Sequence, residues 1–378
     1  MSDRRPPRIA VVGAGIGGLT VTAALRKLGL PATIYEQAPA FGRVGAGIQL
    51  TPNAVKVLRV LGLEQQVRAA AFAPEVGYNR DARTGDVTFL HPMGKVTEDR
   101  YDAPDLSMHR AVLHGALESQ IPHEQIAFGK VLAGVDREGD AVRLSFEDGD
   151  SVVADLVIGA DGIHSIVRHT LVGEEALSFT GRVAYRSVYR SERLGRKIDD
   201  RVKWWGEERH IVTYKIDPRR EELYFIASTP EPDFEVESWS ALGDRDTLLA
   251  AYEGFHPDAR IVLESAPDVR KWALAVRKPL QSWSDERITL LGDAAHPMVP
   301  YMAQGAGSAM EDAIILARLL SKTDPDGYPA ALKVYEAHRI PRTTRIQRAA
   351  SQNKWMHTAS DTDTDWLYGY DAWNGIID

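Results

Sequence analysis

The sequence IAVVGAGIGG, at residues 9–18, decides the fold of this 378-residue chain. Its first four residues are apolar and mostly β-branched, which predicts a buried parallel strand. Gly13, Gly15 and Gly18 then match the G-x-G-x-x-G pattern. The first glycine permits a tight turn, the second allows a pyrophosphate to approach the backbone, and the third lets helix and strand pack closely. The pattern therefore predicts a dinucleotide site at a helix N-terminus.

The residues that follow complete this pattern. Residues 19–28 have helical periodicity, Gly29 ends the helix, and residues 32–36 form a second apolar strand. Glu36 lies 21 residues after Gly15, where an acid can accept hydrogen bonds from an adenosine ribose. A tight turn that binds nothing is the alternative, but it does not require this order of strand, helix, strand and acid.

Composition and charge limit the function classes. The chain is 44% hydrophobic and 26% charged, as in an ordinary globular protein, and its net charge of −8 gives no sign of a nucleic-acid partner. It has no cysteine, which excludes disulfides, thiolate metal sites and a cysteine nucleophile. We expect no metal site, no secretory signal and no membrane span, and therefore a cytoplasmic enzyme.

Two aspartates follow later apolar strands. Asp161-Gly162 comes after the strand at residues 156–158, in a turn that we expect to open a helix with Asp161 as its N-cap. Gly292-Asp293 comes after the strand at residues 288–291, and Gln304-Gly305-Ala306-Gly307 opens a long helix. A carboxylate at a strand end can hold ribose or ribityl hydroxyls, and backbone N–H groups at a helix start can face an electron-rich ring. Either aspartate alone also fits a simple turn.

In this order and spacing, the three motifs resemble the single-component FAD-dependent aromatic hydroxylases, the group of para-hydroxybenzoate and salicylate hydroxylase, from residue 9 to about 352. The resemblance implies an α/β fold: a Rossmann-like FAD-binding domain of the glutathione-reductase type, an inserted β-sheet substrate domain and C-terminal helices. We assign residues 1–75, 106–180 and 273–352 to the discontinuous FAD-binding domain, 76–105 and 181–272 to the β-rich substrate domain, and 353–378 to an aromatic tail.

The resemblance also implies which residues hold FAD. Glu36 would bind the ribose, Asp293 the ribityl chain and Arg110 the cofactor, while Asp161 would serve both FAD and the pyridine nucleotide. The predicted cofactor-binding residues are Gly13, Gly15, Gly18, Glu36, Arg43, Gly47, Arg110, Asp161, Asp293, Gln304, Gly305 and Ala306. Because the sequence has no second G-x-G-x-x-G, we expect NADH or NADPH to reduce the flavin transiently and leave.

The family hydroxylates through a flavin C4a-hydroperoxide, which attacks electron-rich rings and so requires a base near the substrate. His210 and Tyr214 are four residues apart on a predicted strand, so both project from one face. Side by side, they could relay a proton from a bound hydroxyl. Their spacing alone also fits two sheet residues without a role. The resemblance favours catalysis, because a His-x-x-x-Tyr pair is typical of 6-hydroxynicotinate 3-monooxygenases and 3-hydroxybenzoate 6-hydroxylases.

The sequence after Pro300 looks closest to the 6-hydroxynicotinate enzymes, and we predict Pro300, Tyr301 and Gln49 as substrate-binding residues. Gln49 and Tyr301 stand where that pattern has histidines. We expect decarboxylative hydroxylation of 6-hydroxynicotinate to 2,5-dihydroxypyridine, with O₂ and NAD(P)H, by a monomer or homodimer. For the substrate carboxylate the candidates are protonated His210 and backbone N–H groups near Pro300.

Three alternatives remain open at this point: a 3-hydroxybenzoate 6-hydroxylase or salicylate hydroxylase, an FAD-binding dehydrogenase without oxygen insertion, and a non-catalytic Rossmann module. The aromatic tail at residues 365–373 resembles that of the hydroxylases, and we expect it to act by packing.

Overall fold

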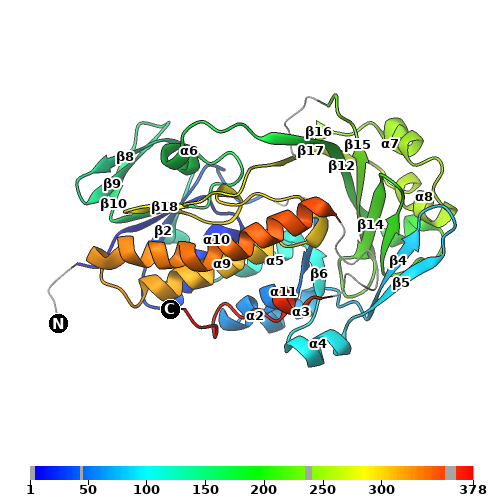
Figure 1. Ribbon diagram of the computed structural model, residues 1–378, viewed down its shortest axis with the longest axis horizontal. Helices are drawn as coiled ribbons and strands as arrows, with labels where there is room; N and C mark the ends of the chain where they lie inside the picture. The colour runs from blue at the N-terminus through cyan, green and yellow to red at the C-terminus, as the bar shows by residue number, and fades with distance from the viewer. Residues whose placement is uncertain (1–4, 43–45, 235–240, 354–362, 378) are drawn as a thin grey trace.

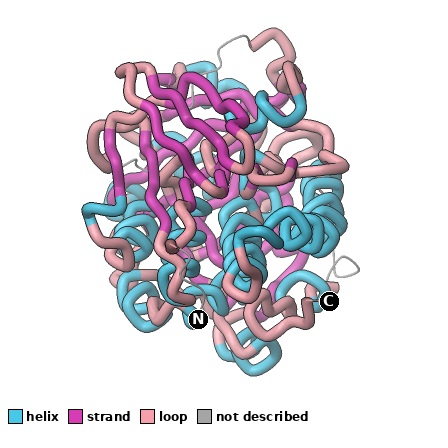
Figure 2. Tube along the Cα trace, turned by 90° about the vertical axis from the view of Figure 1, so that its left-hand side faces the viewer, coloured by secondary structure: helices cyan, strands magenta, loops and turns pink. Residues whose placement is uncertain are grey.

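The computed structural model describes residues 5–42, 46–234, 241–353 and 363–377. A six-stranded sheet lies toward one end of the molecule and an eight-stranded sheet toward the other (Figure 1). In the view of Figure 2, the strands of the eight-stranded sheet gather above a layer made mainly of helices. This arrangement confirms the predicted α/β fold with an inserted β-sheet region, while the exact domain boundaries stay a prediction.

The six-stranded sheet places the glycine motif at its centre. Its strand order is β18-β19-β11-β1-β2-β7, and all neighbours are parallel except β18, which is antiparallel to β19. The strands are β1 (Ile9–Val12), β2 (Ala32–Glu36), β7 (Ile126–Phe128), β11 (Leu156–Gly159), β18 (Ser284–Asp285) and β19 (Ile288–Leu290). The glycines leave the carboxyl end of the central strand β1, which is where open parallel sheets bind ligands.

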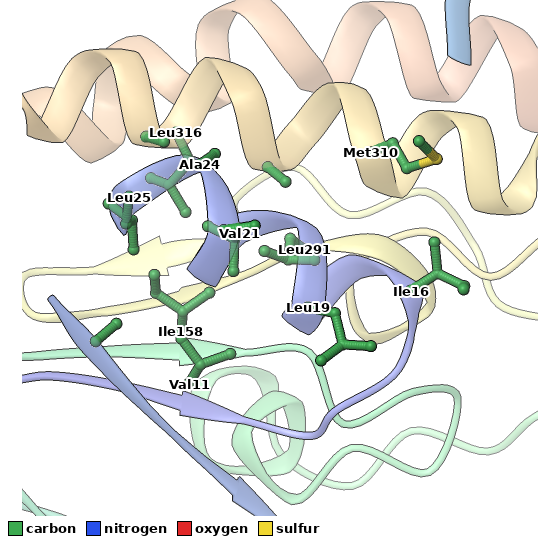
Figure 3. Packing of buried hydrophobic residues seen from close by; sticks show 14 of the residues in the cluster. Val11, Ile16, Leu19, Val21, Ala24, Leu25, Ile158, Leu291, Met310 and Leu316 are labelled. Atoms are coloured by element: carbon green, nitrogen blue, oxygen red, sulfur yellow. The ribbon is translucent and has the colours of Figure 1, made fainter. Parts of the chain in front are cut away.

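Helix α1 (Ile16–Lys27) is buried between this sheet and helix α9 (Gly305–Leu320). Figure 3 shows Val11 of the sheet on one side of Val21 of α1, and Leu316 of α9 on the other. Helix α10 (Tyr328–Gln352) packs against α9 in turn. The N-terminal ends of α1 and α9 are thereby held in one rigid apolar layer.

The remaining helices and small strands surround these layers. The helices are α2 (Pro52–Val60), α3 (Glu64–Ala70), α4 (Lys95–Tyr101), α5 (Arg110–Glu118), α6 (Ile166–Val172), α7 (Arg245–Ala251), α8 (Pro257–Glu264) and α11 (Asp365–Tyr368). Strands β3 (Gly47–Leu50) and β6 (Leu106–His109) form a pair, and β8 (Leu132–Glu138), β9 (Ala141–Phe146) and β10 (Ser151–Ala154) form a meander. Within the described part of the chain, no helix combines the length and apolarity that a membrane span requires.

The eight-stranded sheet has the order β16-β17-β12-β15-β14-β13-β4-β5. The strands are β4 (Val76–Asp81), β5 (Val87–Pro92), β12 (Ser178–Arg190), β13 (Arg201–Trp205), β14 (His210–Lys215), β15 (Glu222–Pro230), β16 (Ala241–Leu242) and β17 (Arg270–Val276). Because strand side chains alternate between faces, positions 201, 203 and 205 of β13 share a face with positions 210, 212 and 214 of β14.

One detail of the predicted helix starts is wrong. Helix α6 begins at Ile166, and its N-cap is Ser165, whose hydroxyl accepts a hydrogen bond from the Arg168 N–H. The Asp161 carboxylate instead accepts hydrogen bonds from the Ser165 hydroxyl and the Val167 N–H. Asp161 therefore braces the loop that leads into the helix, since it lies four residues before the N-cap position Ser165.

Candidate active site

A cavity of about 590 Å³ lies between the two sheets. Its floor consists of the glycine turn before α1, strand β3 and the start of α9, and its roof is one face of the eight-stranded sheet. Helices α4 and α11 contribute to the wall. Pockets for small organic ligands typically have volumes of about 300–1,000 Å³, so this cavity is large enough for one.

The glycine motif leaves room for a ligand while packing tightly beneath it. A Cβ on Gly13, where φ is +96°, would lie 2.6 Å from the carbonyl oxygen of Ala160, and one on Gly18 would lie 2.0 Å from that of Gly13. A Cβ on Gly15 would meet nothing within 4 Å, so the open space lies there. The motif thus has the cradle that a dinucleotide pyrophosphate requires, and its residues fit FAD.

Two opposite charges face the cavity floor. Arg110 and Asp293 both line the cavity. Burial lowers the pKa of Arg110, which the nearby Asp293 partly offsets, and burial raises the pKa of Asp293. A carboxylate enclosed in this way can accept hydrogen bonds from ligand hydroxyls, as predicted for the ribityl chain. Gly47, Gly305 and Ala306 line the same floor.

Other predicted cofactor residues make contacts within the protein. The Glu36 carboxylate accepts hydrogen bonds from the Ala14 N–H at 2.7 Å and the Ala38 N–H at 2.8 Å, so it braces the glycine turn. Gln304 is buried below the cavity and donates from Nε2 to the Thr51 hydroxyl at 2.8 Å. Asp161 lies outside the cavity lining, and Arg43 lies outside the described residues.

A buried ionic network supports the start of α9 from below. Arg339 of α10 donates to Asp312 at 2.7 Å and pairs with Glu311 at 2.8 Å, and all three side chains have no exposed surface. The nearby cations and hydrogen bonds hold the pKa of Asp312 at about 2 despite its burial. His296 Nε2 also contacts Asp312, at 2.6 Å. No sequence pattern pointed to this network, because its members lie on separate segments of the chain that meet only in the fold.

The roof carries His210 and Tyr214, and both line the cavity. They are not in contact: four residues along a strand span about 13 Å, and Val212 lies between them on the same face. The His210 ring instead meets Tyr301, with centroids 5.0 Å apart, and Tyr214 meets Tyr224 at 5.1 Å. The predicted direct proton relay between adjacent rings is therefore corrected: the two residues stand at separate ends of the roof.

Burial gives these two residues opposite roles. It lowers the pKa of His210 well below its usual value, and the positive charges of Lys203 and Arg182 lower it further. The His210 imidazole is thus held in its neutral form, in which one ring nitrogen can accept a hydrogen bond. Burial raises the pKa of Tyr214 well above 10, so its hydroxyl remains a hydrogen-bond donor. Asn353 lies 3.5 Å from His210 Nδ1 and orients the ring.

The predicted substrate residues lie around the same space. Gln49, Pro300 and Tyr301 all line the cavity. Gln49 Oε1 accepts a hydrogen bond from Arg201 at 3.4 Å, while its Nε2 is buried without a partner among the described residues. The Tyr301 hydroxyl lies 3.0 Å from that of Ser228.

The C-terminal tail forms part of the wall as well as packing on the body. The Tyr101 hydroxyl lies 2.6 Å from the hydroxyl of Thr364 and donates to Asp365 at 2.7 Å. Thr364 and Tyr368 line the cavity. The sequence identified the tail but gave no partner for it. Among the described residues, no cluster of His, Cys, Asp or Glu could hold a metal ion.

Comparison with known proteins agrees with this geometry. Residues 7–350 match the model of the FAD binding domain family. The 6-hydroxynicotinate 3-monooxygenase of Bordetella bronchiseptica is 40% identical over 370 residues, covering 97% of this chain and 96% of that protein. The 3-amino-4-hydroxybenzoate 2-monooxygenase of Streptomyces cremeus is 37% identical over 387 residues, covering 97% and 96%. The crystal structure of Klebsiella pneumoniae HpxO complexed with FAD and uric acid matches with a TM-score of 0.82 and 26% identity, covering 96% and 92%.

Proposed function

Because the chain belongs to the FAD binding domain family and is an FAD-dependent aromatic monooxygenase, we propose that it hydroxylates 6-hydroxynicotinate at the carboxyl-bearing carbon. Loss of CO₂ would then give 2,5-dihydroxypyridine. The observation that carries this proposal is the pairing of a neutral imidazole with a protonated phenol at separate ends of one cavity roof. Such a roof can accept a proton from a ring hydroxyl at one end and donate a hydrogen bond at the other.

FAD supplies the oxygen-transfer chemistry when bound, with NADH or NADPH as the reductant typical of the family. His210 accepts the proton of the ring hydroxyl, which makes the ring electron-rich and open to electrophilic attack. Tyr214 donates a hydrogen bond that fixes the ring's orientation, and Gln49 and Tyr301 hold its edges. The enclosed roof and the tail wall exclude water from the reacting atoms.

Two relatives support the substrate class. Both are named for aromatic acids that carry a ring hydroxyl, and each spans nearly the whole chain. The uncharged Gln49 and Tyr301 suit a neutral heteroaromatic edge, since an amide and a phenol can each donate and accept hydrogen bonds.

The test is NADH oxidation by the FAD-loaded protein with 6-hydroxynicotinate, 3-hydroxybenzoate, salicylate and 3-amino-4-hydroxybenzoate in parallel, with mass analysis of the products. We expect 6-hydroxynicotinate to stimulate oxidation most and to yield 2,5-dihydroxypyridine and CO₂. Hydroxylation of another acid instead would keep the reaction class and refute the substrate. Oxidation without any oxygenated product from all four acids would favour the dehydrogenase alternative.

A further inference from the structure

The cavity contains one positive charge that no carboxylate of the described residues balances. Its lysine and arginine side chains are Arg100, Arg110, Arg201 and Lys203. Arg100 pairs with Asp365 at 2.8 Å, and Arg201 lies 3.8 Å from Asp105. Arg110 faces Asp293, as described above. Neither Arg110 nor Lys203 has a carboxylate within 4 Å among the described residues, but the Asp293 charge raises the pKa of Arg110, whereas no carboxylate acts on the pKa of Lys203.

Lys203 also occupies a defined place on the roof. In the register of β13 and β14 it lies directly opposite Val212, the residue that separates His210 from Tyr214. Its ammonium lies 3.6 Å from the ring centroid of Trp205, so its immediate neighbour is aromatic. A ring bound between the histidine and the tyrosine would therefore have a cation at its edge.

We propose that Lys203 binds the carboxylate of the aromatic acid substrate, an inference that rests on the proposed function. A charge-assisted hydrogen bond to the acid would pair the one unbalanced cation of the cavity. The cofactor is not the source of that anion: the pyrophosphate cradle is formed by Gly13 and Gly15 on the floor, whereas Lys203 is on the roof.

The electrostatics of the roof support this assignment over the earlier candidate His210. Burial lowers the pKa of Lys203 to about 7, which shows how strongly the protein around it disfavours its charge. A carboxylate at this point would restore the charged form. Protonation of His210 is the less favourable alternative, because the positive charges of Lys203 and Arg182 oppose it in addition to burial.

The experiment compares wild type with Lys203→Met by titrating the visible absorbance of the bound flavin, without NADH. The probes are 6-hydroxynicotinate and its carboxamide, 6-hydroxynicotinamide, which differ in charge but scarcely in shape. We expect the variant to lose about 10- to 100-fold in affinity for the acid, the range for a hydrogen bond to a charged group. Affinity for the amide should stay nearly unchanged.

Lys215→Met is the matched control. This lysine lies on β14, is buried, and its Nζ donates to the Ser191 hydroxyl at 2.7 Å outside the cavity lining. It should bind acid and amide as the wild type does. Lys203→Arg keeps the charge and should recover part of the lost affinity. In the absence of ligand, Lys203→Met should raise the melting temperature, because it removes an unpaired buried charge.

The outcomes separate this proposal from the proposed function. If Lys203→Met binds the acid as tightly as wild type, Lys203 is not the anchor, and hydroxylation of 6-hydroxynicotinate would stand unaffected. If wild type binds the amide as tightly as the acid, the carboxylate has no ionic anchor and the Lys203 proposal falls. If neither wild type nor the control binds any of the four acids of the turnover panel, both proposals fall together.

Discussion

The floor and the roof of the cavity are built on different principles. The shape of the floor is set by the backbone. Gly13 and Gly18 leave no room for a Cβ, and the residues next to them in the chain form the rest of the cradle. The chemistry of the roof is set by side chains. The alternation along each strand and the register between β13 and β14 turn His210, Tyr214 and Lys203 toward the cavity. Floor changes should therefore affect folding and cofactor binding, while the main effect of roof changes should be on substrate binding and turnover.

The largest effect should come from Gly18→Val on the floor. The added side chain would clash with the Gly13 carbonyl, 2.0 Å from the Cβ position, and separate α1 from β1. We expect loss of folded, yellow protein, measured as the flavin-to-protein absorbance ratio and by circular dichroism. Gly15→Ala is the matched comparison, because its Cβ meets only open space. It should keep the wild-type melting temperature of the FAD-free protein and bind FAD more weakly, and a normal FAD affinity would refute the cradle.

The second-largest effect should come from breaking the buried ionic network beneath the floor. Arg339→Met would leave the buried carboxylates of Asp312 and Glu311 short of a cation. Breaking a buried ion network by removing one partner costs about 3–5 kcal/mol in free energy of unfolding. Denaturant titration of the holoenzyme measures it. The exposed pair Lys95–Asp99 offers a control, since solvent screens its charges and Lys95→Met should leave the free energy of unfolding nearly unchanged. Equal effects of the two variants would contradict the supporting role.

On the roof, His210→Ala should leave FAD bound and slow hydroxylation by about 100-fold or more, since it removes the proton acceptor. The measurement is product formation under saturating NADH, with the flavin spectrum as the control for cofactor content. Tyr214→Phe keeps the ring and removes only the donor, so it should raise KM more than it lowers kcat. Nearly unchanged turnover by His210→Ala would show that the base lies elsewhere.

The smallest effect concerns Asp105, which lies between floor and roof. Burial raises its pKa to about 6, although Arg201 opposes this. A carboxyl group whose pKa is higher in the folded than in the unfolded state loses stability as pH rises through the folded value. The Asp105→Asn variant has no titrating carboxyl group at this position and does not lose this stability. Its free energy of unfolding relative to wild type should therefore rise by about 1 kcal/mol between pH 5 and pH 8. Denaturant titrations at both pH values measure it, and a constant difference would contradict the raised pKa.

The contrast between floor and roof also explains which predictions succeeded. The glycine motif, the strands around it and the helix after Gln304 follow from local patterns, because each is decided by neighbours in the chain. The assignment of Gln304 to the cofactor shows the limit. Its backbone opens α9 beneath the cavity, but its side chain turns away to Thr51, 253 residues distant in the chain.

Lys203 shows the limit more clearly. The register of β13 and β14 places it on the cavity face of the roof, and its role depends on the charges that surround it there. That balance involves Asp105, Asp293 and Asp365, which lie on three separate segments. Likewise, the four-residue spacing of His210 and Tyr214 correctly predicted a shared face but not their separation, since strand geometry puts Val212 between them.

The sequence by itself determined the fold class and the FAD cofactor, because these depend on backbone conformations that only certain residues at fixed spacing allow, and its resemblance to the aromatic hydroxylases indicated the reaction class. Only the tertiary structure decided which side chains meet in the cavity, which charges are balanced there and how far the His210 pKa is lowered. Burial and charge pairing are sums over neighbours brought together from the whole chain, so no local stretch of sequence contains them.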